Sequence, residues 1–152
     1  MLYLVRHAKA GSRSEWTGND RLRPLSKKGR AQAVLLADRL EPLARGELVS
    51  SPSLRCIDTL QPLAERTGRA VRGDERLGED RGFEGALALL DELADGSVLC
   101  SHGDVIPATI AALQRRGCRI VTVPDWRKAS VWVLTRSGAA FVAADVWPPP
   151  KS

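Results

Sequence analysis

Leu2-Tyr3-Leu4-Val5-Arg6-His7-Ala8, at the start of the chain, is the stretch that decides the fold. Its apolar residues predict a buried β-strand over 2–6, and this strand delivers an arginine and a histidine at its end. The other histidine of the chain, His102, follows a second apolar run, Ser97-Val98-Leu99-Cys100-Ser101. Ligands of open α/β sheets bind at the carboxyl ends of the strands. We therefore expect His7 and His102 to share one site at that edge.

The rest of the chain alternates between strand-like and helix-like patterns. Ser26 is a typical N-cap for the first helix, and Gly68 fits the end of the second. The predicted helices cover 27–44, 53–67, 84–94 and 105–116, and the predicted strands cover 2–6, 47–51, 70–72, 97–101, 119–123, 129–135 and 139–146, the last after a turn at 136–138. This order predicts an α/β fold, a three-layer α/β/α sandwich with a mostly parallel central sheet.

Length and composition set limits on the class of protein. A chain of 152 residues fits one domain, 1–152, with a substantial core. Its apolar runs are too short to span a bilayer, and its first residues lack the pattern of a signal peptide. The three cysteines are widely spaced and form no C-x-x-C pair, which favours reduced thiols in a cytoplasmic protein over disulfides or a zinc site.

The chain is basic, with 23 Lys and Arg residues, a net charge of +5 and a pI near 9.6. Most of these cations are arginines, whose planar fork binds phosphate oxygens bidentately. Aromatic residues make up 5% of the chain and no basic-aromatic repeat occurs, which argues against a nucleic-acid partner. For most of these side chains the simpler interpretation is solvated surface charge, and no pattern indicates an oligomeric state.

Four motifs resemble those of one known family. Leu4-Val5-Arg6-His7-Ala8 resembles the Arg-His-Gly signature of the histidine phosphatase superfamily, with Ala8 in place of glycine. The segments 23–33 and 50–60 resemble its next two motifs, and Ser101-His102-Gly103 resembles its second histidine motif. The motifs follow the family order. The chain is most similar to short SixA-like phosphohistidine phosphatases and to histidine phosphatase domains that are fused to bacterial Nudix hydrolases.

The resemblance implies a phosphoglycerate mutase-like fold, no cofactor and no metal. It also implies that His7 is the nucleophile, which becomes a phosphohistidine that water hydrolyses. The chemistry agrees, because neutral imidazole is a competent nucleophile near pH 7 and phosphoryl transfer needs cations around the equatorial oxygens. Arg6 and Arg55 would bind those oxygens. Arg6 ends an apolar strand and needs a partner, and Arg55 in a first helical turn is disfavoured without a nearby anion.

The second histidine motif supplies further contacts to the substrate. His102 would donate a hydrogen bond to the phosphoryl group and stabilise its charge in the transition state. Gly103 would allow close approach of the backbone where the next helix begins, and a helix N-terminus favours anions.

A general acid is needed where the leaving group is an alkoxide. Relatives with such an acid carry it in a Leu-x-Glu step, which points to Glu79, and Glu84 is the alternative. A phosphohistidine substrate depends less on this acid. Lys9, Arg13 and Trp16, in the long polar loop 9–25, are candidates for the mouth of the site. Asn19 and Asp20 are out of register with a phosphate-binding asparagine of mutase-like members, so no role is transferred to them.

These features predict a metal-independent phosphatase acting on a protein phosphohistidine or a small phosphate compound. Within enzymes, the alternative substrates are nucleotides or other phosphorylated metabolites, and the short chain disfavours a phosphoglycerate mutase. A metal hydrolase using both histidines would need more ligands at suitable spacing than the sequence offers. A non-catalytic module that binds phosphate or nucleic acid is a further alternative, and its binding would depend on salt but not on His7.

Overall fold

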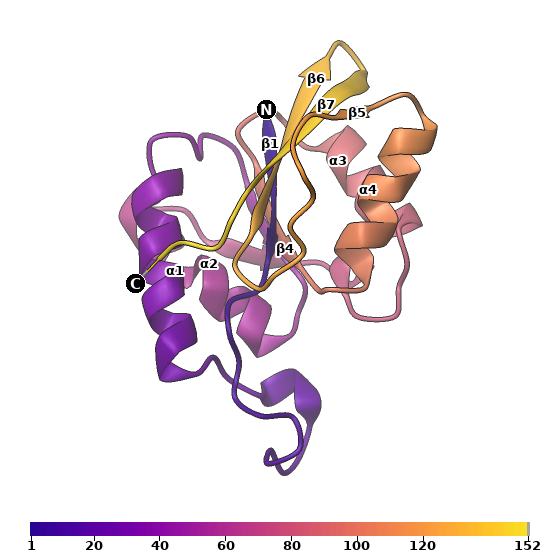
Figure 1. The fold of residues 1–152 in the computed structure, drawn as a ribbon. Coiled ribbons are helices and arrows are strands. Elements are labelled where there is room, and N and C mark those ends of the chain that lie inside the picture. The colour runs from indigo at the N-terminus through magenta and orange to yellow at the C-terminus, as the bar shows by residue number, and fades with distance from the viewer. Residues whose placement is uncertain (152) are drawn as a thin grey trace.

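The computed structural model describes residues 1–151 and contains one seven-stranded sheet between two pairs of helices (Figure 1). The strands are β1 (Leu2–Arg6), β2 (Leu48–Ser50), β3 (Val71–Gly73), β4 (Val98–Ser101), β5 (Arg119–Ile120), β6 (Val131–Ser137) and β7 (Ala140–Trp147). The helices are α1 (Lys27–Leu40), α2 (Leu54–Thr67), α3 (Glu84–Glu92) and α4 (Val105–Arg115), with short 3₁₀ helices η1 (Asp20–Leu22) and η2 (Glu75–Leu77). The predicted domain 1–152 and its tail include Ser152, which lies outside the described residues.

The sheet order is β3-β2-β4-β1-β6-β7-β5, and the strands around β4 are all parallel. Strand β6 runs antiparallel to both of its neighbours, whereas β5 and β7 are parallel. The predicted three-layer α/β/α sandwich with a mostly parallel sheet is therefore confirmed.

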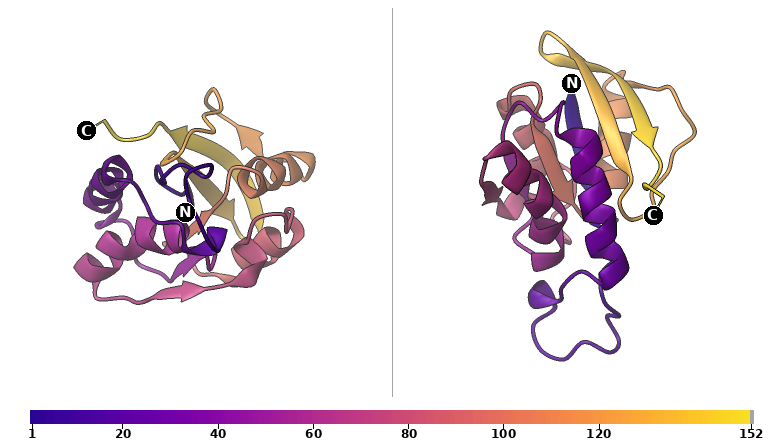
Figure 2. Two further views of the ribbon diagram at one scale, coloured as in Figure 1. Left: turned by 90° about the horizontal axis from the view of Figure 1, so that it is seen from below. Right: turned by 90° about the vertical axis from the view of Figure 1, so that its left-hand side faces the viewer.

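Strand β1 builds both hydrophobic cores because alternate side chains of a strand point to opposite faces. Leu2 and Leu4 belong to the core that contains the apolar residues of α3 and α4. Tyr3 and Val5 belong to the core that contains those of α1 and α2. Figure 2 shows the two helical layers on either side of the sheet. Every apolar side chain of β1 is thus buried, which makes its carboxyl end a fixed support for Arg6 and His7.

Most helices and strands begin and end within a few residues of the predicted positions, because local sequence signals determine these ends. The hydroxyl of Ser26 accepts a hydrogen bond from the Gly29 amide at 3.1 Å and caps α1. Gly68 ends α2 with a left-handed φ of 72°, a conformation that glycine adopts without steric cost.

Two predicted boundaries were wrong by more than two residues, and one predicted turn was misplaced. Helix α1 ends at Leu40 rather than at 44, because Pro42 has no amide hydrogen to continue the helix. Strand β5 covers two residues instead of 119–123, since it pairs with β7 only at Arg119 and Ile120. The last turn falls after Ser137, at Gly138, which has a φ of 62°. Among residues 1–151 no helix is long and apolar enough to cross a membrane.

Candidate active site

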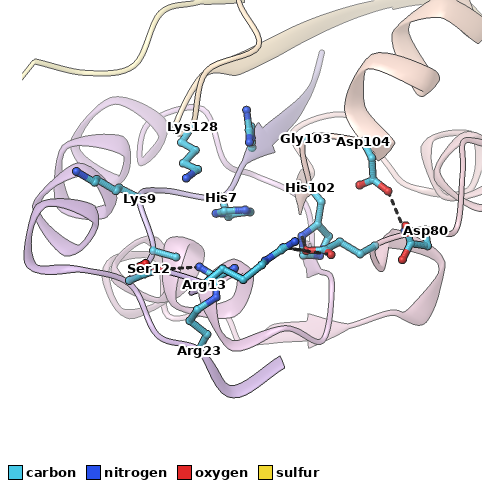
Figure 3. Close-up of a pocket in the computed structure, with 14 residues that line it drawn as sticks. His7, Lys9, Ser12, Arg13, Arg23, Asp80, His102, Gly103, Asp104 and Lys128 are labelled. Carbon is cyan, nitrogen blue, oxygen red and sulfur yellow. Dashed lines mark hydrogen bonds and ion pairs between the residues drawn. The ribbon is translucent and has the colours of Figure 1, made fainter. Parts of the chain in front are cut away.

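The carboxyl ends of β1 and β4 lie side by side and bring the two histidines together. Arg6 is in register with Ser101, and the His7 amide donates to the Ser101 carbonyl at 3.1 Å. The imidazole rings of His7 and His102 are edge to face, with their centroids 5.5 Å apart. Both line one cavity of about 730 Å³ (Figure 3). The prediction that the two histidines share this edge of the sheet is confirmed.

The hydrogen bond of His7 determines which of its nitrogens is free. Its Nδ1 lies 2.8 Å from the carbonyl oxygen of Ala8. Because a carbonyl only accepts, Nδ1 carries the hydrogen and Nε2 keeps its lone pair. Burial of the ring lowers the pKa of His7 to about 3. The Ala8 hydrogen bond opposes this shift, and the charges of His102, Arg55 and Arg6 add smaller contributions to it. His7 is therefore neutral at physiological pH.

The Arg6 guanidinium is tied on one side and packed on the other. Its Nη1 donates to the backbone carbonyl of Trp126 at 2.6 Å, and its Nε is buried without a hydrogen-bond partner. A Cβ on Gly103 would lie 2.7 Å from the Arg6 Cζ, so the glycine backbone packs directly against the guanidinium. Burial lowers the pKa of Arg6, and Asp104 partly opposes this shift. The predicted close approach at Gly103 is thus to Arg6.

Arg55 reaches the same site from the first turn of α2 and is 1% exposed. Its Nη2 forms ion pairs with the carboxylates of Glu79 and of Asp20, the latter at 3.2 Å, while its Nε is buried without a partner. The anion that sequence reasoning required near this arginine is therefore a pair of carboxylates in the structure. Partial burial opposes ionisation of Asp20, but Arg23 and Arg55 hold the pKa of Asp20 below its ordinary value.

His102 is held by one side chain from the segment before α2 and one from the first turn of α2. Its Nε2 lies 2.8 Å from Ser51 Oγ and 3.6 Å from Cys56 Sγ. Its Nδ1 lies 3.2 Å from Glu79 Oε1, but the two are not aligned for a hydrogen bond. Ser51 and His102 are both essentially unexposed, so this contact is shielded from water.

The two candidate general acids occupy different places. Glu79 follows η2 and lines the cavity, where its carboxylate also lies 3.2 Å from Arg13 Nη2. Glu84 begins α3, is exposed and does not line the cavity. The loop between them is anchored to the site, because the Asp80 amide donates to the Asp104 carboxylate at 2.8 Å.

The mouth of the cavity contains some of the predicted loop residues and one that was not predicted. Lys9 and Arg13 line it, whereas Trp16 does not and instead donates from Nε1 to the Asn19 carbonyl. Lys128 was missed, and its side chain points toward His7 (Figure 3). No local pattern distinguishes this lysine, which reaches the site because the segment before β6 passes the end of β1.

Two other contributors were missed by sequence reasoning. Asp20 lies in the loop for which no role was transferred, and only the fold brings it to Arg55. Ser51 is part of a family-like segment, which was the available signal for it. Within residues 1–151 no group of three or more His, Cys, Asp or Glu side chains is placed to hold a metal ion.

Comparison with known proteins gives one family match. A sequence profile of the histidine phosphatase superfamily (branch 1) matches residues 2–86, more than half of the chain. A curated protein of Mycolicibacterium smegmatis, named 8-oxo-(d)GTP phosphatase, is 36% identical over 154 residues. That alignment covers 97% of this chain but 48% of the relative, so the chain spans about half the length of that protein.

Solved structures show the same fold. The protein histidine phosphatase SixA, complexed with tungstate, superposes with a TM-score of 0.73 over 94% of each chain, at 19% identity. A mycobacterial glucosyl-3-phosphoglycerate phosphatase superposes with a TM-score of 0.69 over 99% of each chain, at 25% identity. The two neighbours carry different substrate names on one fold, so the fold does not specify the substrate.

Proposed function

Because the chain belongs to the histidine phosphatase superfamily, we propose that it is a metal-independent phosphatase that works through a phosphohistidine on His7. The observation that carries this proposal is the hydrogen bond from His7 Nδ1 to the Ala8 carbonyl, which leaves Nε2 as an unprotonated nucleophile. The low pKa of His7, about 3, keeps this nitrogen available at neutral pH. The nucleophile therefore needs no separate base to activate it.

Arg6, Arg55 and His102 are the proposed ligands of the phosphoryl oxygens. Both arginines have a buried Nε without a hydrogen-bond partner, and an unpaired buried donor is costly unless a ligand satisfies it. An oxyanion between them would supply the missing acceptors and gain from the low dielectric of the site. The phosphoryl group would compete with Glu79 and Asp20 for Arg55, so these carboxylates shift when it binds.

Glu79 is the proposed general acid and base. For a phosphate ester, the P–O bond to the leaving group breaks in the first step, a P–N bond to His7 forms, and Glu79 gives its proton to the leaving oxygen. For a protein phosphohistidine, the bond that breaks is the P–N bond of the substrate, and its imidazole leaves with less need of that proton. In the second step water attacks phosphorus, the P–N bond breaks, and Glu79 takes the proton from that water. The position of Glu79 in the cavity supports this role over Glu84, which lies outside it.

Ser51 is the proposed positioning residue for His102. A hydroxyl that donates to Nε2 at 2.8 Å fixes the ring hydrogen on Nδ1, which then faces the site as a donor. His102 would thus reach the phosphoryl group as a neutral hydrogen-bond donor.

The proposed substrate is a protein phosphohistidine or a small phosphate compound. The cavity of about 730 Å³ is within the usual range for small ligands. The relative named 8-oxo-(d)GTP phosphatase favours nucleotides as the second candidate. The three free, buried cysteines favour a reducing compartment such as the cytoplasm.

The test is phosphate release from a small aryl phosphate in excess chelator. The wild type and a Lys27→Ala control, which changes an exposed lysine outside the cavity, should turn over. His7→Ala should lose about 10⁴-fold or more in kcat, because no nucleophile remains. An alkaline quench of the wild type should trap an acid-labile phosphoryl-enzyme that His7→Ala does not form.

Three outcomes would contradict the proposal. Equal rates in the wild type and His7→Ala would remove His7 as the nucleophile. Loss of turnover on adding chelator would indicate a metal hydrolase. Salt-dependent binding of phosphorylated partners without turnover of any of them would indicate a binding module.

A further inference from the structure

A second cavity, of about 700 Å³, continues from the first, and most of the residues that line it are Lys or Arg. The two cavities share Arg6, Lys9 and Lys128. We refer to the second as the basic groove, which is lined by Arg6, Lys9, Lys28, Gln32, Arg127, Lys128, Pro149, Pro150 and Lys151. No carboxylate is among these lining residues. The groove is lined by Lys28 and Gln32 of α1 and by the C-terminal segment, which lies beside α1 in Figures 1 and 2.

Three lysines of the groove form no ion pair within the described part of the chain, unlike most of its arginines. Within residues 1–151 no carboxylate oxygen lies within 4.0 Å of the ammonium nitrogen of Lys9, Lys28 or Lys128. Partial burial and the nearby charges of Arg6 and Arg23 lower the pKa of Lys128. Like charges that face one another repel, and an anion between them removes the repulsion. The charge pattern of the groove is thus that of an anion site.

The backbone of Lys9 is fixed against α1. The Lys9 amide donates to Gln32 Oε1 at 3.0 Å, and the Lys9 carbonyl accepts from the Ser26 amide at 2.9 Å. Gly29 packs so tightly that a Cβ there would lie 1.8 Å from the Lys9 carbonyl oxygen. From this position the Lys9 side chain points away from His7 (Figure 3), into the part of the cavity shared with the groove.

The backbone beside Lys128 is also fixed, and it is strained. Ala129 has a φ of 68°, in the left-handed region that residues with a Cβ rarely adopt. Its amide donates to the carbonyls of Arg6 at 3.1 Å and His7 at 3.2 Å, which holds Lys128 beside the end of β1. Such strain persists where the surrounding structure requires it, and it often accompanies a functional site.

Building on the proposed function, we propose that the basic groove holds a second phosphate of the substrate. The substrate class is then a small molecule with two phosphates, such as a nucleoside diphosphate or a bisphosphate. The phosphoryl group that is transferred to His7 lies between Arg6 and Arg55, and the second phosphate lies among Lys9, Lys28 and Lys128. The second phosphate leaves unchanged with the leaving group, so the bonds broken and formed are those of the proposed reaction.

The experiment is calorimetric binding of inorganic pyrophosphate and inorganic phosphate to His7→Ala, which is not expected to turn over either. Pyrophosphate should bind about tenfold or more tightly than phosphate, since one charge-assisted contact supplies that factor. Adding Lys28→Ala should weaken pyrophosphate binding about tenfold and phosphate binding less than about twofold. Adding Lys27→Ala, its exposed neighbour outside the groove, should change neither.

Equal affinities for pyrophosphate and phosphate would overturn the second subsite. Equal effects of Lys27→Ala and Lys28→Ala on pyrophosphate binding would also overturn it, because they would indicate a non-specific electrostatic attraction by the basic surface. A third outcome would indicate a protein partner instead of a second phosphate. In that case Lys28→Ala would lower kcat/KM for a phosphohistidine protein, while pyrophosphate would bind no tighter than phosphate. These outcomes are distinct from failure of the proposed function, because binding is measured without catalysis. Failure of the proposed function is read separately, from the turnover of the wild type and of His7→Ala in excess chelator.

Discussion

Gly103→Ala tests whether the Arg6 guanidinium must keep its position for phosphoryl transfer. A Cβ at residue 103 would lie 2.7 Å from both Cζ and Nη2 of Arg6. The guanidinium would have to move by roughly 0.8 Å to restore a normal carbon contact of about 3.5 Å. It cannot do so freely, because Nη1 is bonded to the Trp126 carbonyl at 2.6 Å on its other side.

A displacement of this size should be expensive for catalysis. A misplacement of about 1 Å in a catalytic group costs on the order of 100-fold in rate. We therefore expect Gly103→Ala to lower kcat/KM for an aryl phosphate by about 30- to 100-fold while the protein stays folded. Steady-state kinetics in excess chelator measure this loss, and circular dichroism with thermal melting checks the fold.

Gly73→Ala is the matched control for this experiment. Gly73 ends β3, no heavy atom lies within 4 Å of a Cβ built there, and neither glycine has a left-handed φ. The control should keep kcat/KM within about twofold of the wild type, as surface changes usually do. A folded Gly103→Ala with wild-type kcat/KM would refute the reasoning, because Arg6 would then tolerate displacement.

Three further predictions follow from the same geometry. Glu79→Gln should lower kcat by about 10²-fold or more for alkyl phosphates but much less for aryl phosphates, whose leaving groups need little protonation; an equal loss for both substrates would remove Glu79 as the acid. The pKa of His7 is about 3 in the folded protein, against an ordinary value of 6.5. The unfolded chain therefore binds a proton more readily, so the contribution of His7 to the free energy of unfolding is complete above pH 6.5 and falls with pH, by about 2 kcal/mol at pH 5. Urea unfolding at pH 7 and pH 5 should show that this loss is absent in His7→Asn, and identical pH dependence in both proteins would contradict the prediction. Ser51→Ala should lower kcat about tenfold with little change in KM, because the His102 tautomer is no longer fixed; a change in KM alone would exclude the positioning role.

Sequence reasoning succeeded where the signal is local. The run Leu2–Val5 has the composition of a buried strand, and the structure buries every one of these side chains. Helix starts and ends followed from short-range hydrogen bonding, as at Ser26 and Gly68. The meeting of His7 and His102 also followed, since both come directly after apolar runs that must lie in one sheet.

Contacts that join distant segments of the chain were not predictable from the sequence. Nothing near residue 20 predicts that the Asp20 carboxylate reaches Arg55, because the path of loop 9–25 depends on where α2 begins. The resemblance favoured Glu79 over Glu84 through its Leu-x-Glu step, but only the fold shows that Glu79 lines the cavity and Glu84 does not.

By itself, the sequence determined the order of strands and helices, the family, and the residue types of a phosphoryl-transfer site, because periodicity, caps and motifs are properties of neighbouring residues. The tertiary structure alone decided which nitrogen of His7 is free, how tightly Gly103 packs on Arg6, and how Lys128 comes to lie beside residues more than a hundred positions away in sequence. These features arise from β1 pairing with β4 and β6, and such long-range pairing places side chains with a precision that no local pattern encodes.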